Sequence, residues 1–154
     1  MPKAAAPATS EVLRSSTLTD HLNFLLARAN AIALAAGNAA LAQHGLKVRS
    51  YSVLVLASGD ARPSQRELAE FLQLDPSQVV SLVDGLESRG LVERTPDPSD
   101  RRANVVVATD AGRALAAVAG ESAQAAEQRV HARLTSDERE TLATLLRSLA
   151  FPED

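Results

Sequence analysis

The sequence contains no cysteine and only two lysines, Lys3 and Lys47. The missing thiols exclude thiol catalysis, cysteine-ligated zinc, iron–sulfur clusters and cysteine-based redox sensing. The other basic side chains are arginines, which suit bidentate contacts with phosphate and guanine, although a G+C-rich genome produces the same bias. Aromatic residues are only 3% of the chain. About a fifth of the chain is alanine, which favours helices.

No long hydrophobic run and no strong charge excess are present in the 154 residues, a length typical of one domain. The alanine-rich stretch 31–42 is shorter than the roughly 20 residues of a membrane span, and residues 1–10 lack a secretory signal pattern and are interpreted as a disordered tail. The net charge of −3 means that any anion-binding surface is local. We therefore expect a soluble cytoplasmic protein with no membrane partner.

Hydrophobic periodicity and capping residues predict a series of helices. Apolar residues at three- and four-residue steps predict a helix from Thr17 to Gly45, where the glycine ends it. The apolar run 48–57 fits a buried strand or a buried helix, and we interpret it as a helix. Ser64 and Glu67 form a predicted capping box at the start of the next helix.

A second short helix follows after a tight turn. Asp75 is its predicted N-cap, Pro76 suits the first helical position, and Gln78 is expected to complete a second capping box. The helix is predicted to end near Gly90. The two short helices therefore form a predicted helix–turn–helix.

Two β-prone runs, 91–95 and 104–108, predict a hairpin, because a turn-rich segment separates them. Thr109 is expected to cap a long helix reaching about Arg133, and Thr135 to open a last helix. The predicted fold class is mainly α with a short β-hairpin wing, that is, a winged helix–turn–helix with a helical dimerisation region.

The terminal helices carry apolar stripes that the small domain has to bury. Packing across a two-fold axis would bury them, so the stripes are compatible with a homodimer. The candidate dimerisation region is formed by residues 11–46 and 110–154, and the candidate winged helix–turn–helix DNA-binding module by residues 47–109.

The second helix of such a pair enters the DNA major groove, while the wing reaches phosphates or the minor groove. Its first turns place Ser77, Gln78, Val80 and Ser81 outward or on the flanks of the buried face. Glutamine pairs with adenine, serine with several bases, and a valine methyl with the thymine methyl. The alternative is an ordinary solvated helix face.

Three arginines, Arg94, Arg101 and Arg102, are expected to gather at the hairpin tip and contact the DNA backbone. In the alternative reading, Asp97 and Asp100 simply neutralise them. Six arginines face eight carboxylates between positions 62 and 102, so the module is not basic overall. This acidic excess keeps open a second class of function, a winged-helix adaptor that binds protein or RNA.

The wing resembles that of MarR-family transcription regulators, because Asp100-Arg101-Arg102 is followed after five residues by Ala108-Thr109, with alanine in place of the family's leucine. The stretch 75–94 is also similar to that family's recognition helix and first wing strand. Ser81 and Gly85 stand where the family often has basic residues, which places more of the phosphate contact on the wing arginines. The cysteine-based peroxide-sensing branch is excluded.

The resemblance implies a ligand-responsive repressor of double-stranded DNA that reads pseudopalindromic operators as a homodimer. It also implies a small phenolic or anionic effector, for which His21, Arg28, Arg49 and Tyr51 are candidate contacts by position. The candidate DNA contacts are Ser64, Gln65, Arg66, Ser77, Gln78, Val80, Ser81, Arg94, Asp100, Arg101 and Arg102.

Enzyme motifs are missing: there is no glycine-rich phosphate loop, nucleophile elbow or suitable pair of carboxylates. His21, His44 and His131 lack the spacing of metal ligands. We therefore expect no catalysis, no metal and no cofactor.

Overall fold

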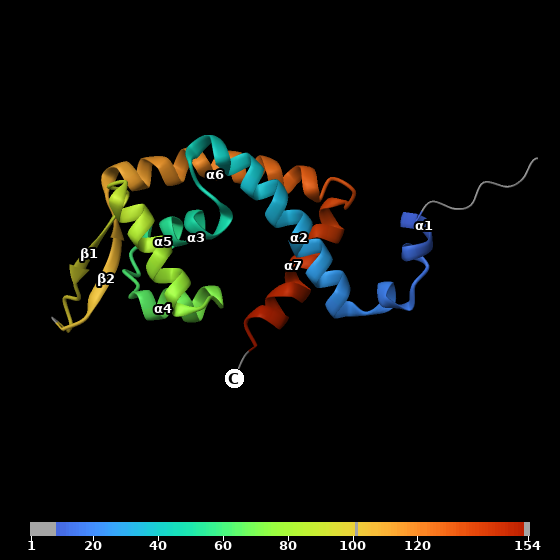
Figure 1. The fold of residues 1–154 in the computed structure, drawn as a ribbon, viewed down its shortest axis with the longest axis horizontal. Helices are drawn as coiled ribbons and strands as arrows, with labels where there is room; N and C mark the ends of the chain where they lie inside the picture. The colour runs from blue at the N-terminus through green and yellow to red at the C-terminus, as the bar shows by residue number, and fades with distance from the viewer. Residues whose placement is uncertain (1–8, 101, 153–154) are drawn as a thin grey trace, which may run out of the picture.

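The computed structural model describes residues 9–100 and 102–152, which form seven α-helices, two short 3-10 helices and a two-stranded hairpin. Figure 1 shows an elongated chain, with the hairpin at one end and α1 at the other. In chain order the elements are α1 (Thr9–Arg14), η1 (Thr17–Asp20), α2 (Leu22–Leu41), η2 (Ala42–His44), α3 (Val48–Ser58), α4 (Gln65–Leu72), α5 (Pro76–Ser88), β1 (Val92–Pro96), β2 (Asn104–Ala108), α6 (Asp110–Val130) and α7 (Ser136–Ala150).

The long helices α2 and α6 pack against each other and form the arm of the molecule (Figure 1). Helix α3 packs beneath this arm and contacts α5, so it joins the arm to the helix–turn–helix. The apolar run 48–57 is therefore a helix, as predicted. Helix α7 follows α6 after a turn and contributes no buried residue.

Local chemistry explains the helix–turn–helix. The predicted capping box at Ser64 and Glu67 is confirmed, with each side chain bonded to the other's backbone N–H. Helix α4 ends at Gln73, whose left-handed backbone (φ 52°) turns the chain sharply into α5. Asp75 caps α5 as predicted, but its carboxylate accepts from the backbone N–H and hydroxyl of Ser77. The predicted capping box with Gln78 is wrong, because Ser77 lies closer to the cap.

The wing is an antiparallel hairpin in which Val92 faces Ala108 and Pro96 faces Asn104. It starts after Gly90, whose φ of 68° favours glycine and lets the chain leave α5. At its other end the Thr109 hydroxyl donates to the Gly90 carbonyl and accepts from the Gly112 N–H, as a cap of α6. One threonine thus joins the wing, the recognition helix and the arm.

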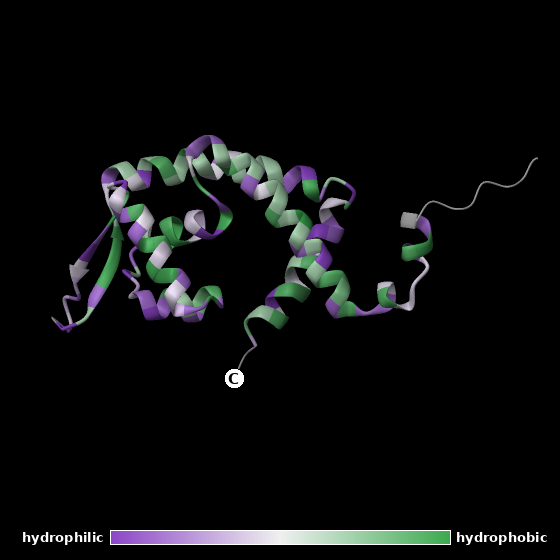
Figure 2. Cartoon of the chain, viewed as in Figure 1, coloured by the Kyte–Doolittle hydropathy of each residue, from purple (hydrophilic) through white to green (hydrophobic). Residues whose placement is uncertain are grey.

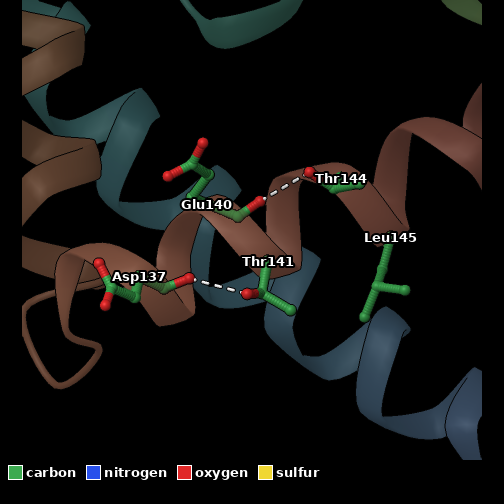
Figure 3. A pocket seen from close by; sticks show the side chains of 5 residues that line it. All are labelled: Asp137, Glu140, Thr141, Thr144 and Leu145. Carbon is green, nitrogen blue, oxygen red and sulfur yellow. Dashed lines mark hydrogen bonds between the residues drawn. The ribbon is translucent and has the colours of Figure 1, made fainter.

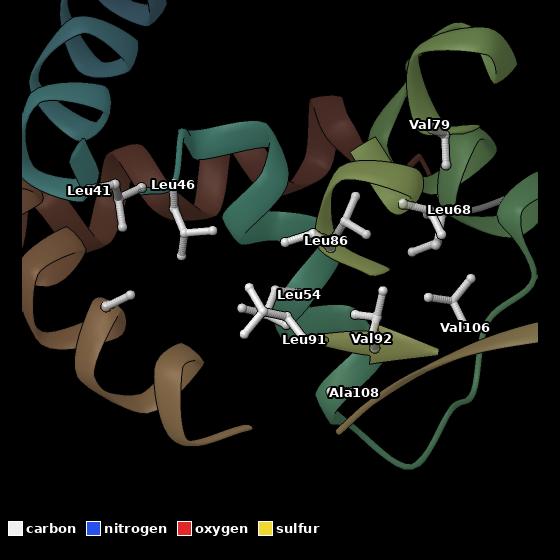
Figure 4. Packing of buried hydrophobic residues seen from close by; sticks show 14 of the residues in the cluster. Leu41, Leu46, Leu54, Leu68, Val79, Leu86, Leu91, Val92, Val106 and Ala108 are labelled. Carbon is white, nitrogen blue, oxygen red and sulfur yellow. The ribbon is translucent and has the colours of Figure 1, made fainter. Parts of the chain in front are cut away.

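A single hydrophobic cluster lies between α3, α4, α5, the hairpin and the arm, as Figure 4 shows. Leu54, Val79 and Val83 are completely buried within it. Gly112 lets α6 reach the hairpin, because a Cβ there would lie 1.9 Å from the Leu91 carbonyl oxygen. The core therefore fixes the wing and α5 relative to the arm.

The N-terminal part differs from the expected single helix of residues 17–45. The chain forms η1, becomes extended at His21 (ψ 120°), and only then starts α2. The Ser16 hydroxyl accepts from the Leu18 N–H and stabilises the separate turn. Thr9 and Ser10, expected in the disordered tail, begin α1, while residues 1–8 lie outside the described part of the chain. Helix α6 ends at Val130, three residues before the expected Arg133.

By length and composition the helical stretch Leu22–His44 could cross a membrane, with a mean hydropathy of 1.4 over an 18-residue window. The apolar run was expected to be too short to cross a membrane on the basis of positions 31–42 alone. This expectation is wrong, because the apolar helical stretch is longer. Only 11% of the window is fully buried within the chain.

Candidate DNA-binding interface

The first turns of α5 point away from the core, because Val79, Val83 and Leu86 are buried on the opposite face. All four predicted contacts on this helix are exposed: Ser77, Gln78, Val80 and Ser81. The hydroxyls of the two serines bond within the chain, to Asp75 and to the Ser77 carbonyl (3.1 Å) respectively. Gln78 and Val80 therefore present the amide and the methyl groups at this surface.

The three candidates at the start of α4 have different surroundings. The Ser64 hydroxyl donates to the Glu67 carboxylate and accepts from the Glu67 N–H, so it is already bonded in the helix cap. Arg66 is 87% exposed and pairs with Glu70 at 2.8 Å, and this hydrogen bond and charge raise the pKa of Arg66. Gln65 accepts from the Arg94 guanidinium at 2.8 Å. Of these three, Arg66 has the side chain most open to an approaching phosphate.

Arg94 was expected at the hairpin tip, and this prediction is wrong. It lies in β1, beside α5. Its guanidinium pairs with the carboxylates of Asp84 and Glu87, and its backbone N–H donates to Glu87 at 3.0 Å. Only 22% of its side chain is exposed. Partial burial lowers its pKa, but the hydrogen bond to Asp84 and the charge of Glu87 outweigh this and raise it. The positive charge of Arg94 is therefore paired within the protein, where two carboxylates surround it.

The tip of the wing is exposed and held by aspartates. Asp97 accepts from the backbone N–H and hydroxyl of Ser99, which lowers the pKa of Asp97. Asp100 accepts from the Arg102 N–H at 3.0 Å and so fixes the turn, while the Arg102 residue is exposed. Arg101 lies outside the described residues. Asp100 thus shapes the tip, and Arg102 is the described arginine that the tip presents.

The four effector candidates do not form one site in the single chain. His21 and Arg28 are exposed on or before α2 and line none of the described cavities. Arg49 lines a cavity with Lys47 between α2, α3 and α5. Tyr51 lines a different cavity, between α2, α3 and α6. No group of three metal-ligating side chains occurs within residues 9–100 and 102–152.

Sequence reasoning missed Arg89, which joins the end of α5 to the arm. Its guanidinium donates to the carbonyls of Gly45 (2.7 Å) and His44 (3.0 Å), where η2 ends. The His44 ring in turn bonds the Ser122 hydroxyl of α6 at 2.9 Å. No local pattern could have revealed these contacts, because the partners of Arg89 lie 44 and 45 positions away.

Helices α4 and α5, the tight turn between them and the following hairpin define a winged helix–turn–helix, a class of DNA-binding protein. Residues 44–103 match the model of the MarR family. A transcriptional repressor of Mycobacterium tuberculosis is 32% identical over 128 residues, covering 83% of this chain and 92% of the repressor. The chain belongs to the MarR family of transcription regulators.

Solved structures extend the similarity to nearly the whole chain. A MarR-family regulator from Rhodococcus sp. RHA1 is 44% identical with a TM-score of 0.83, over 90% of this chain and all of that one. CouR from Rhodococcus jostii RHA1, bound to p-coumaroyl-CoA, is 46% identical with a TM-score of 0.82, over 91% and 99%. A regulatory protein for the hcr operon of Thauera aromatica is 33% identical, but the chain spans 60% of its length.

Proposed function

We propose that the chain is a transcriptional repressor that binds a pseudopalindromic DNA site as a homodimer and is released by a small ligand. Each protomer places the start of α5 in the major groove and the wing on the backbone. Residues 47–109 form the DNA-binding module, and residues 11–46 and 110–154 the dimerisation region. We assign it to the cytoplasm, where its DNA lies, and assign it no enzymatic activity.

The observation that carries DNA binding is the exposed start of α5 together with the exposed wing tip of the same module. Gln78 and Val80 are exposed while the opposite helix face is buried, and Arg102 is exposed at the wing. Amide and methyl groups are the partners expected for an A·T base pair in the major groove. The nearby acidic residues Asp84 and Glu87 are paired with Arg94 and so oppose the DNA phosphates less than their number suggests.

Exposed apolar side chains at both ends of the chain support the homodimer. Figure 2 shows strongly hydrophobic segments along α2 and α7 outside the compact module. Large exposed apolar patches mark interaction surfaces. A second copy would cover them in the regulator, which also explains why α2 is apolar without lying in a membrane. The exposed apolar residues at the two ends of the chain, from α1 to α2 and from α7 to Phe151, are Val12, Leu13, Leu18, Leu22, Leu25, Ile32, Leu142, Leu145, Leu146, Leu149 and Phe151.

Helix α7 also has an open hollow on its surface. A hollow of about 310 Å³ lies along it, and all five lining residues belong to α7 itself (Figure 3). The Thr141 and Thr144 hydroxyls donate to the carbonyls of Asp137 (2.9 Å) and Glu140 (3.0 Å), so they are satisfied within the helix. Leu145 is 58% exposed beside them. A hollow with walls from one helix is a surface that a partner helix would complete.

The relatives support the ligand response. CouR is bound to p-coumaroyl-CoA, and the Mycobacterium tuberculosis regulator, 32% identical with a TM-score of 0.70, forms a complex with salicylic acid. Both ligands contain a hydroxylated aromatic ring. We assign this chain an effector of the same kind, bound between the arm and the winged module. Among the four effector candidates, Tyr51 has the position that supports this role best.

Footprinting on the DNA that flanks the gene tests this function. The wild-type protein is expected to protect a pseudopalindromic site, and binding should weaken steeply with salt as counterions are released. Arg102→Ala should weaken binding and reduce the magnitude of the salt slope by about one. Arg129→Ala is the matched control, because it removes an exposed arginine from the far end of α6.

The outcomes separate the two classes of function. Protection lost equally in both variants would contradict a wing contact and indicate a general charge effect. A folded dimer that protects no DNA at low salt, in flanking or in genomic fragments, would overturn DNA recognition and favour the protein- or RNA-binding adaptor.

A further inference from the structure

The end of α7 contacts the winged module through a pair of aromatic rings. The ring centroids of Phe71, in α4, and Phe151, which follows α7, lie 5.8 Å apart, with an angle of 32° between the ring planes. This distance lies within the range of attractive aromatic pairs. The chain has only three phenylalanines and one tyrosine, and two of these four rings meet here from opposite halves of the sequence.

No polar contact accompanies this aromatic pair. Within residues 9–100 and 102–152, no hydrogen bond or ion pair joins α7 to another helix or strand. The Phe151 N–H donates to the Arg147 carbonyl at 2.9 Å, which keeps Phe151 at the end of α7. Phe71 and Phe151 are 57% and 59% exposed. The pair is therefore a contact between two surface side chains, which can separate without opening the hydrophobic core.

Phe71 lies at the end of α4 that leads into the recognition helix. It comes shortly before Gln73, whose left-handed backbone turns the chain into α5. The Leu74 N–H donates to the Ala69 carbonyl at 3.0 Å, so the turn is bonded to α4 itself. A contact that holds Phe71 in place therefore also holds the exposed start of α5.

The winged module is thus attached to the dimerisation region on two sides. On one side, Thr109 and Gly112 join α6 to the hairpin and to the end of α5. On the other side, Phe71 contacts Phe151. In Figure 1, α6 runs along one edge of the molecule, whereas α4 and the C-terminus lie towards the opposite edge. A rotation of the module about its connection to α6 would separate the two rings, so the pair restricts this hinge motion.

We infer that Phe71 and Phe151 are positioning residues that fix the orientation of the winged module and so make the dimer selective for one spacing of its two half-sites. One added base pair moves a half-site by about 3.4 Å along the DNA axis and about 35° around it. A module with a fixed orientation cannot follow this displacement, whereas a freely rotating module follows part of it. The inference rests on the proposed function for dimeric DNA binding, but the ring contact itself does not.

The test compares the protected site found by footprinting with versions that have one or two base pairs added or removed between the half-sites. The wild type is expected to bind the altered sites at least about tenfold more weakly, because only one module then binds well. Phe71→Ala and Phe151→Ala should each reduce this affinity ratio several-fold. The double variant should reduce it no further than either single variant, because both act through one contact.

Three controls separate positioning from a general structural effect. Phe151→Tyr keeps the ring and should keep the wild-type ratio. Val118→Ala shortens another exposed apolar side chain, on α6, and should also leave the ratio unchanged. Size exclusion with light scattering should show that every variant is dimeric. An undiminished ratio in both phenylalanine-to-alanine variants, an equal reduction in Val118→Ala, or a monomeric Phe151→Ala would overturn the inference.

Cross-linking without DNA distinguishes a failure of this inference from a failure of the proposed function. Because the chain contains no cysteine, Phe71→Cys/Phe151→Cys has only the two introduced thiols. A short bismaleimide should join them within one chain, detected as a cross-linked peptide in the monomer band of a denaturing gel. Phe151→Cys alone should give no such peptide. Cross-links only between chains, or none, would overturn the inference. An intrachain cross-link in a protein that protects no DNA would instead overturn the proposed function, and with it the role in spacing.

Discussion

Arg94 illustrates how one side chain is used differently from what its position in the sequence suggests. It joins β1 to α5 through Asp84 and Glu87, and to α4 through Gln65. Three elements of the winged module thus meet at one guanidinium, whose planar fork suits several acceptors at once. We interpret Arg94 as a positioning residue that fixes the wing relative to the recognition helix.

Arg94→Ala is expected to lower the free energy of unfolding by about 1–3 kcal/mol, because Asp84 and Glu87 lose their partner. Its salt slope for DNA binding should match that of the wild type, unlike that of Arg102→Ala, since no phosphate contact is removed. Urea unfolding and footprinting over a salt series measure the two effects. Unchanged stability together with a smaller slope would instead identify Arg94 as a phosphate contact.

Thr95 offers a second test at the same strand. Its hydroxyl is buried and has no hydrogen-bond partner among the described residues. Valine has nearly the same shape and no polar group to desolvate, so Thr95→Val should raise the free energy of unfolding by about 1 kcal/mol. Ser99→Ala is a useful contrast, because that hydroxyl is bonded to Asp97 at 2.8 Å and its loss should not stabilise. A destabilised Thr95→Val would point to an ordered water on the hydroxyl.

At the scale of elements, the residues at helix ends contain much of the information that predicts where each helix starts and stops. The capping boxes at Ser64–Glu67 and Thr135–Glu138 and the left-handed glycines Gly45 and Gly90 were all predictable from neighbouring residues. Each signal depends on chemistry within three or four positions of the chain. The limits of the helices therefore followed closely from the sequence, except at α1, at the separation of η1 from α2 and at the end of α6.

Contacts between elements were not predictable in this way. The arginines of the module were recognised as a group, but the sequence does not reveal that Arg94 is paired inside the protein or that Arg89 binds the end of η2. These bonds depend on the packing of α3 between the arm and α5. The wing and the start of α5 were found because a family motif and helix periodicity mark them, whereas the cavity beside Tyr51 exists only once three distant helices pack together.

Arg89 makes a testable link between elements. It neutralises the C-terminal end of η2, where carbonyl groups lack helical partners. Arg89→Ala should lower the free energy of unfolding by about 1 kcal/mol and weaken DNA binding, because the end of α5 is no longer held to the arm. Arg133→Ala removes an exposed arginine after α6 and serves as the control. Unchanged DNA affinity in Arg89→Ala would show that the core alone positions α5.

The caps predict how stability depends on pH. Hydrogen bonds from the Thr135 N–H and hydroxyl lower the pKa of Glu138 below its ordinary value of 4.5, and Ser64 does the same for Glu67. A carboxyl group with a lowered folded pKa stabilises above its unfolded pKa, and this contribution disappears as the pH falls through the folded pKa. Stability should therefore fall below about pH 4.5.

Glu138→Gln isolates this effect. Its melting temperature should be lower than that of the wild type at pH 7, and the difference should shrink as the pH is lowered below 4.5. Glu121→Gln, which removes an exposed glutamate of α6 that caps nothing, is the control. Thermal unfolding at equal protein concentration measures all three proteins. A difference that persists unchanged at pH 3 would contradict a role for the ionised cap.

At the scale of the whole molecule, one part of the chain has a hydrophobic core of its own and another part does not. The winged module surrounds a closed core, whereas α7 has no buried residue and Leu145 and Leu149 are 58% and 62% exposed. A helix that buries nothing in its own chain gains its stability from a partner. Dimerisation would also bring two modules onto one DNA molecule, which multiplies affinity without adding any new contact.

The double variant Leu145→Asp/Leu149→Asp is therefore expected to be monomeric by light scattering after size exclusion, because two carboxylates would be buried in the interface. Its winged module should stay folded, since neither residue belongs to the core. DNA affinity should fall by about 100-fold or more, as each module then binds a half-site alone. Val118→Asp, at a 55% exposed position of α6, should remain dimeric and bind DNA normally. A monomeric wild-type protein that protects the full site would show that the apolar face of α7 serves another partner and that the two modules bind independently.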